Sequence, residues 1–127
     1  MKLHDPNASF RLNQEGLKKF LGDLECEIME IVWFRSNPTI TVREVYDVIK
    51  KERSVAYTTI MTTMNRLYEK DMLKLVGKIG LANCFSPVMT KEKYIKSAVE
   101  LMLKVINKDF NKEYKDYLEK QAVKKKR

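Results

Sequence analysis

Two amphipathic segments separated by a short connection, and followed by a glycine-containing hairpin pattern, constrain this chain most. In the first segment Thr41 and Glu44 form a capping box, in which the hydroxyl and the carboxylate satisfy backbone amides reciprocally. Apolar side chains then recur at helical spacing, at Val42, Val45, Tyr46 and Ile49. The pattern predicts a helix that begins after Thr41 and ends near Lys51.

The second segment, AYTTIMTTMNRLYEKDML at residues 56–73, contains four threonines. Threonine is a mediocre helix former, because its branched β-carbon loses side-chain freedom against the preceding turn. On a helical wheel Met64 and Leu67 lie within about 40° of Ile60, which predicts the face turned to the core. Helix stability does not explain the threonines at 58, 59, 62 and 63, so their face requires another explanation.

The flanking segments complete a recognisable order. Before the capping box, Asp23 is expected to cap a helix that stops before Pro38, and Thr39-Ile40 is expected to form a short strand. The acids of this helix are expected to serve helix capping and a solvated face, at Asp23, Glu25, Glu27 and Glu30. After the second segment, the runs 72–76 and 81–87 flank a turn at Gly77–Gly80 and predict a β-hairpin. The order of helix, strand, helix, helix and hairpin is that of a winged helix-turn-helix.

The fold class expected is therefore mainly α with a small β-hairpin wing, followed by helices. Residues 1–20 form an N-terminal extension, 21–88 the winged-helix DNA-binding domain, and 89–127 a helical dimerisation region with a basic tail. From Thr90 two apolar stripes lie side by side, and after a break at Asn107 a shorter helix follows. This apolar face has too little chain to cover it, which predicts a homodimer. The expected dimerisation residues are Tyr94, Ile95, Ala98, Leu101, Met102, Val105, Phe110, Tyr114 and Tyr117.

Charge points to a polyanionic partner. The 127 residues carry a net charge of +8 at pH 7, and residues 89–127 hold 12 basic against 6 acidic side chains. An excess of this size favours binding to nucleic acid, although a basic tail by itself is weak evidence.

Other functional classes fit the sequence poorly. No apolar run reaches the roughly 18–20 residues of a membrane span, and the N-terminus lacks a secretory h-region, so we expect a cytoplasmic protein with no membrane partner. The single histidine and the two cysteines, Cys26 and Cys84, match no metal or catalytic motif. Both cysteines are expected to be structural, Cys26 buried on a helix and Cys84 in a strand. We expect no enzyme activity, no metal and no cofactor.

The outward face of the threonine-rich helix predicts base contacts. Thr58, Met61, Thr62, Asn65 and Glu69 lie opposite the core face, with Thr59 and Arg66 together on one flank. Short polar side chains of this kind fit a major groove, where threonine and asparagine can read base edges. Thr63 is expected to fill a semi-buried gap. Met61 is expected to lie either at the edge of the core or in the DNA groove. Tyr57 is expected either to donate a hydrogen bond to a phosphate or simply to pack. Lysines continue the positive line into the hairpin. The expected DNA-binding residues are Tyr57, Thr58, Thr59, Met61, Thr62, Asn65, Arg66, Lys70, Lys74 and Lys78.

Three segments, LGDLECEIMEIVW (21–33), TVREVYDVI (41–49) and AYTTIMTTMNRLYEKDML (56–73), resemble the penicillinase-repressor family of BlaI, MecI and CopY type. The resemblance implies a dimeric repressor of a dyad-symmetric double-stranded DNA operator, with a recognition helix at about 57–70 in the major groove and a wing at 72–86 on the backbone. It also implies a regulatory protease as a partner, although the Asn-Phe cleavage dipeptide of the β-lactam-responsive branch is absent. The Cys-x-Cys tail of the copper-responsive branch is absent too, and Leu81 stands where the family wing usually has arginine.

A different class of function remains open. The same fold can dock a protein and bind no operator, and the positive line from Arg66 to Lys78 argues against this alternative. Titration of random duplex against a promoter-proximal palindrome would separate the two.

Overall fold

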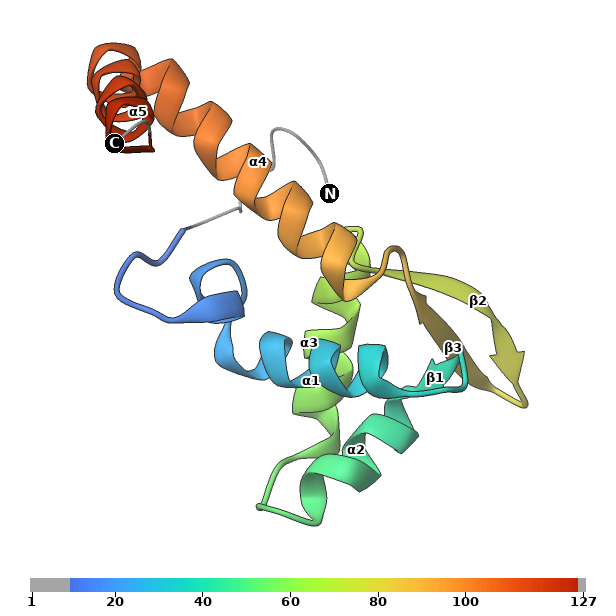
Figure 1. Ribbon diagram of the computed structural model, residues 1–127. Helices are drawn as coiled ribbons and strands as arrows, with labels where there is room; N and C mark the ends of the chain where they lie inside the picture. The colour runs from blue at the N-terminus through green and yellow to red at the C-terminus, as the bar shows by residue number, and fades with distance from the viewer. Residues whose placement is uncertain (1–9, 126–127) are drawn as a thin grey trace.

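The helices and strands follow the predicted order (Figure 1). The computed structural model describes residues 10–125. A short 3-10 helix, η1 (Gly16–Lys19), precedes the first α-helix. The remaining elements are α1 (Asp23–Phe34), β1 (Ile40–Thr41), α2 (Val42–Lys50), α3 (Tyr57–Glu69), β2 (Leu73–Ile79), β3 (Ala82–Pro87), α4 (Lys91–Asp109) and α5 (Asn111–Lys125). No helix in this range is both long and apolar enough to cross a membrane.

Local capping sets the starts of the helices. The capping box of α2 is confirmed: the Glu44 amide donates to Thr41 Oγ1 at 3.2 Å, and the Thr41 amide donates to Glu44 Oε1 at 3.1 Å. Burial alone would raise the pKa of Glu44, but hydrogen bonds from Thr41 and the Arg35 guanidinium outweigh it and hold that pKa below its usual value. The expectation that Asp23 caps α1 is wrong, because the cap is Gly22, whose amide donates to Glu25 Oε1 at 2.9 Å.

The sheet is a three-stranded antiparallel one in the order β1-β3-β2. Its hairpin differs from the predicted one in the position of the turn. The strands continue to the pair Ile79 and Ala82, so the turn consists of Gly80 and Leu81. Gly77 lies inside β2 with φ of +147°, directly after a β-bulge that leaves Val76 without a cross-strand partner.

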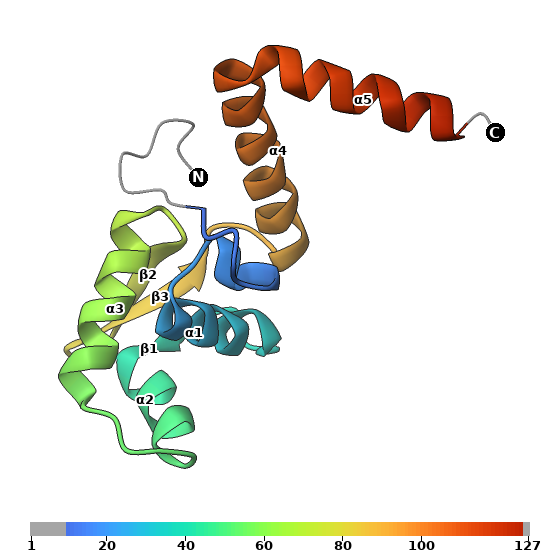
Figure 2. The ribbon, with the colours of Figure 1, turned by 90° about the vertical axis from the view of Figure 1, so that its left-hand side faces the viewer.

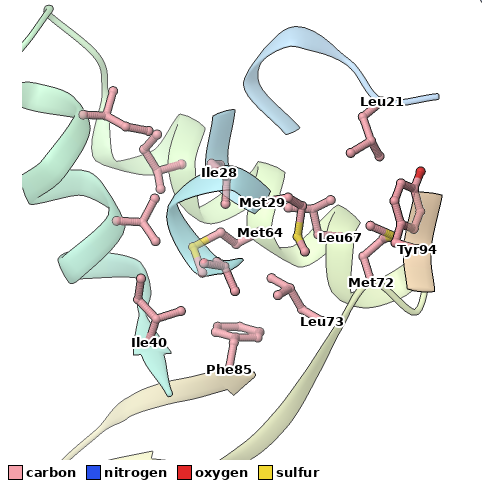
Figure 3. Packing of buried hydrophobic residues seen from close by; sticks show 14 of the residues in the cluster. Leu21, Ile28, Met29, Ile40, Met64, Leu67, Met72, Leu73, Phe85 and Tyr94 are labelled. Atoms are coloured by element: carbon pink, nitrogen blue, oxygen red, sulfur yellow. The ribbon is translucent and has the colours of Figure 1, made fainter. Parts of the chain in front are cut away.

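The hydrophobic core lies where α1, α2 and α3 meet the inner face of the sheet (Figure 3). Ile28 from α1, Met64 from α3 and Phe85 from β3 are almost fully buried there. Leu21, just before α1, closes the same core. Apolar side chains spaced at 3.6 residues on three helices thus form one interior, because no helix can bury its stripe alone.

The first half of α4 belongs to this core as well. Tyr94 is 2% exposed and Ala98 is 1% exposed, both packed within the chain's own core, and Leu101 is also buried. The Trp33 indole donates to the Met89 carbonyl at 3.0 Å and its ring lies 5.7 Å from that of Tyr94. This burial raises the pKa of Tyr94. The prediction that Tyr94, Ala98 and Leu101 serve dimerisation is therefore corrected: this chain itself covers them.

Beyond the core, α4 and α5 form an arm (Figures 1 and 2). The helix α4 continues to Asp109, so the predicted break at Asn107 lies slightly later, at Phe110. In Figure 2, α5 leaves the far end of α4 at a steep angle and runs away from the three-helix unit. Large apolar side chains on this arm are exposed, at Val99, Leu103, Val105, Phe110, Tyr117, Leu118 and Val123.

Candidate nucleic-acid interface

The helix α3 presents an apolar face to the core and a polar face to solvent, as predicted. Ile60, Met64 and Leu67 are fully buried. The residues predicted to face DNA are all exposed: Tyr57, Thr58, Thr59, Met61, Thr62, Asn65 and Arg66. Met61, for which the sequence left two interpretations, is 39% exposed and does not belong to the core cluster, and its place in a groove stays a prediction. The outward face thus combines short polar side chains with one cation and no acid before Glu69.

Thr63 differs from its neighbours in the way the sequence predicts. It is buried, and its Oγ1 donates to the Thr59 carbonyl at 2.8 Å. A threonine hydroxyl that donates to a backbone carbonyl of the preceding helical turn needs no hydrogen-bond partner from outside the helix. One of the four threonines is therefore structural, and the other three face outward.

The N-terminus of α3 is left open. Side-chain hydroxyls cap α2 at Thr41 and α4 at Thr90, whereas the capping residue before α3 is Ala56, which offers no side-chain acceptor. The first turn of α3 also lacks an acidic residue. Unsatisfied amides and the positive end of the helix dipole together favour an anion such as a phosphate.

An aromatic and cationic cluster that the sequence did not predict lies beside this open end. The Tyr57 ring meets the Tyr46 ring edge-on at a centroid distance of 5.5 Å. Lys50 Nζ lies 5.2 Å and the Arg43 guanidinium 5.8 Å from the centre of the Tyr46 ring. Tyr57 therefore packs and, at 39% exposed, keeps an accessible surface, so its contact with a phosphate stays a prediction. The missed signal was the spacing of Arg43, Tyr46 and Lys50 on one side of α2.

Asp47 moderates the charge of that cluster. Its Oδ1 lies 3.4 Å from Arg43 Nε and 3.2 Å from Lys50 Nζ. These distances meet the criterion for ion pairs, yet the geometry gives Asp47 Oδ1 no hydrogen bond among the described residues. Ion pairs that lack hydrogen-bond geometry and involve exposed cations stabilise only weakly. The two cations are thus loosely held and remain near the open end of α3.

The wing separates two lysines that the sequence placed on one line. Cross-strand partners in an antiparallel pair share a face, so Lys78 and its partner Asn83 lie on the side of Phe85. Phe85 faces α3, where its ring meets that of Tyr68 at a centroid distance of 6.5 Å. Lys74 pairs with Ser86 on the opposite side, because the bulge after Leu75 changes the alternation. Lys78 therefore shares the side of α3, and Lys74 does not.

Lys70, a predicted DNA-binding residue, forms an ion pair within the chain. Its Nζ donates to Glu25 Oε2 at 2.8 Å, and the Glu25 side chain is mostly buried. The pair joins the end of α3 to the start of α1, so Lys70 has a tertiary role that the sequence did not predict, and its DNA contact stays a prediction.

The same arrangement repeats along α1, where the sequence predicts helix capping and a solvated acidic face. Four carboxylates pair with bases from four other segments: Asp23 with Arg11, Glu25 with Lys70, Glu27 with Arg53, and Glu30 with Lys91. Hydrogen bonding to Glu27 raises the pKa of Arg53, and hydrogen bonding to Glu30 raises that of Lys91. Acids are thereby neutralised on α1, whereas Arg66, Lys74 and Lys78 pair with no acid among the described residues.

The described residues hold little that suggests other chemistry. Between residues 10 and 125, no three His, Cys, Asp or Glu side chains gather as a metal site. Both cysteines are free thiols, and burial together with the Glu30 charge raises the pKa of Cys26, which weakens it as a nucleophile.

Comparison with known proteins agrees with this geometry. A family model described as penicillinase repressor matches residues 21–126. The chain belongs to the penicillinase repressor family. The resemblance found in the three sequence segments is thus confirmed, and the family match extends over the α4–α5 arm.

Individual members of the family can also be compared. Two curated relatives, each a transcriptional regulator BlaI from a strain of Mycobacterium tuberculosis (CDC 1551 / Oshkosh and ATCC 25618 / H37Rv), are 35% identical over 75 residues, which is 59% of this chain. The chain spans about half the length of the curated relatives it matches, 53% of each. The solution structure of the DNA binding domain of the repressor BlaI is 27% identical and superimposes with a TM-score of 0.50, over 58% of this chain and 87% of that one. The predicted winged-helix fold class is confirmed.

Proposed function

We propose that this protein is a transcriptional repressor that binds a dyad-symmetric DNA operator as a homodimer. The observation that carries the proposal is the outward face of α3, where Thr58, Thr62 and Asn65 are exposed and Thr63 turns inward. Membership of the penicillinase repressor family and the likeness to the DNA binding domain of the repressor BlaI support it.

The chemistry of this face suits base readout in the major groove. An α-helix fits that groove, and side chains that reach base edges specify sequence. Asn65 can make paired hydrogen bonds with adenine, and the threonine methyl groups can contact the methyl group of thymine. Because Thr58 and Thr62 are short, the helix backbone can approach the bases closely.

Phosphate contacts would hold the helix in register. The open N-terminus of α3 and the Tyr57 hydroxyl form one candidate contact, with Arg43 and Lys50 beside them. Lys78 on the wing forms a second, on the same side of the hairpin as α3. Cations at these points favour DNA over a protein as the partner of this face.

The arm supplies the dimer contact in this proposal. Its apolar side chains are exposed beyond the buried part of α4, and a second copy would cover them. Ile95 packs partly against the chain's own core, so we assign the contact to the more distal residues. Those predicted from the sequence and still accessible are Met102, Val105, Phe110, Tyr114 and Tyr117.

Two neighbouring substitutions of equal chemistry test the proposal. Selection from a random double-stranded DNA library should give the wild type a palindromic sequence. Thr62→Val should weaken preference at one base position in each half-site, by about 1 kcal/mol or more of discrimination. Thr63→Val is the matched control, because its hydroxyl bonds to Thr59 and should leave the preference intact.

Two results would contradict the proposal. If the wild type enriches no sequence, operator binding is wrong and the α3 face serves another partner. If Thr63→Val alters the selected sequence as much as Thr62→Val does, the assigned reading face is wrong.

A further inference from the structure

We propose that α1 sets the orientation of α3 on DNA by holding this helix at both ends with two ion pairs. Glu27 pairs with Arg53, which lies four residues before the start of α3, and Glu25 pairs with Lys70, the residue that caps its end. The inference rests on the proposed function, because it concerns how α3 is placed against the nucleobases. It makes Glu25 and Glu27 positioning residues for sequence recognition.

The two carboxylates reach opposite ends of α3 because of where they lie on α1. Figure 1 shows α1 lying across α3, and the two helices are in contact. Side chains two residues apart on a helix project about 200° apart, so Glu25 and Glu27 lie on nearly opposite sides of α1. Each is therefore directed toward a different end of α3, and each meets a basic side chain there.

Both contacts are better formed than an ordinary surface ion pair. The Arg53 guanidinium donates to both oxygens of Glu27, at 2.8 and 2.6 Å. Glu25 is only 9% exposed, and both of its oxygens accept hydrogen bonds, Oε1 from the Gly22 amide at 2.9 Å and Oε2 from Lys70 Nζ at 2.8 Å. A bidentate fork and a mostly buried carboxylate fix the geometry of their partners, which a single exposed pair does not do.

The start of α3 is where the fork matters most. Ala56 provides no side-chain cap, and the connection that precedes it is exposed over residues 51–54. The Arg53 amide donates to the Ile49 carbonyl at 3.2 Å, which ties the connection to α2. The fork to Glu27 adds a link to α1 and leaves the first amides of α3 uncovered. The start of the helix is thereby held in place without loss of the anion site proposed there.

The end of α3 is closed by its own backbone and joined to α1 by a side chain. The Met72 amide donates to the Leu67 carbonyl at 2.9 Å, a bond of the kind that terminates many helices. That bond fixes the local path of the chain and makes no contact with α1. The pair of Lys70 with Glu25 supplies this contact.

A contact at the end of a helix controls its tilt more than a contact at its middle does. The 13 residues of α3 span about 20 Å, so each end lies about 10 Å from the middle. A shift of about 1 Å at one end then tilts the helix by about 6°. Recognition of a ligand by side chains requires placement to about 0.5 Å. Loss of either ion pair should therefore impair readout by the side chains nearest to that end.

The test replaces the carboxylates, because a basic side chain could touch DNA itself. Glu27→Gln and Glu25→Gln each raise the net charge by one, which through long-range attraction alone should strengthen binding to every DNA. Asp23→Asn is the matched control. It makes the same charge change on the same helix and releases Arg11, whose side chain contacts residues 18, 21 and 23. Fluorescence anisotropy gives the affinity of each variant for the DNA selected by the wild type and for random duplex.

The expected result is a loss of selectivity. For Glu27→Gln and Glu25→Gln, the ratio of the affinity for selected DNA to that for random duplex should fall about tenfold, the effect of weakening one base contact. Arg53→Lys should also lower this ratio, because lysine retains the charge but cannot form the fork. The double variant of Glu27→Gln and Arg53→Lys should be no worse than either single variant, since both changes break the same contact. Asp23→Asn should keep the wild-type ratio.

A role in stability alone would give a different result. Unfolded protein binds neither DNA, so a loss of folded protein lowers both affinities by the same factor and leaves their ratio unchanged. A lower urea midpoint with an unchanged ratio for Glu27→Gln and Glu25→Gln would therefore refute the inference.

Three other outcomes would overturn it as well. An equal fall for Asp23→Asn would trace the effect to the charge of α1. A fall for Arg53→Lys but not for Glu27→Gln would show that Arg53 itself contacts DNA. If the wild type selects no sequence, the proposed function fails and the inference fails with it, whereas selection by the wild type with unchanged ratios in the variants refutes the inference alone.

Discussion

Lys78→Ala should reduce the salt dependence of DNA binding more than Lys74→Ala does. Both lysines are exposed on β2, and neither pairs with an acid among the described residues, so neither substitution breaks an ion pair there. The two positions differ in their side of the hairpin, because Lys78 shares a side with Phe85 and Lys74 with Cys84.

The size of the effect follows from counterion release. Each phosphate contact contributes about 0.9 to the slope of log K against log salt concentration. A dimer carries two copies of Lys78, so Lys78→Ala should reduce the slope by about 1.8. Between 50 and 200 mM salt, the wild type should then lose about twelvefold more affinity than the variant does.

The assay is fluorescence anisotropy with the selected DNA at four or more salt concentrations. Random duplex of equal length serves as a second ligand, and Lys78→Ala should weaken both complexes by a similar factor, because a phosphate contact carries no sequence information. Lys74→Ala is the matched control and should leave most of the slope intact.

Equal slopes for the two variants would refute the argument from strand register. A larger change for Lys74→Ala would show that the opposite side of the hairpin faces DNA. A decrease of about 0.9 for Lys78→Ala would show that only one copy of the wing touches a phosphate.

Two further predictions concern stability. Asp71 lies at the end of α3 with φ of +60°, a backbone conformation that costs free energy for β-branched residues. Asp71→Ile should therefore lower the free energy of unfolding by about 1–2 kcal/mol. An unchanged urea midpoint would contradict this prediction. The folded-state pKa of Glu44 is lowered, so its stabilising contribution is present above the unfolded pKa of about 4.3 and is lost as pH falls through the folded pKa. Urea unfolding should therefore show Glu44→Gln less stable than the wild type at pH 7 and closer to it at pH 3, whereas an equal difference at both pH values would argue against the linkage.

Local patterns in the sequence were enough to predict the helices and the face of α3. The stripe of Ile60, Met64 and Leu67 follows from a 3.6-residue period, and the capping box of Thr41 and Glu44 from a spacing of three. Each feature depends only on residues within one or two helical turns along the sequence. It can therefore be recognised from the sequence alone. The inward direction of Thr63 was predictable for the same reason.

Tertiary structure decided the features that depend on distant partners. Lys70 meets Glu25 across 45 positions, and no periodicity in either segment indicates that contact. The apolar stripe of α4 predicts burial but not its partner, so Tyr94 and Ala98 were assigned to a second copy, whereas the chain's own core covers them. The bulge after Leu75 is a property of strand pairing, and it alone placed Lys74 and Lys78 on opposite sides of the wing. Helical periodicity fixes which side of a segment is buried, whereas only the packed chain determines what buries it.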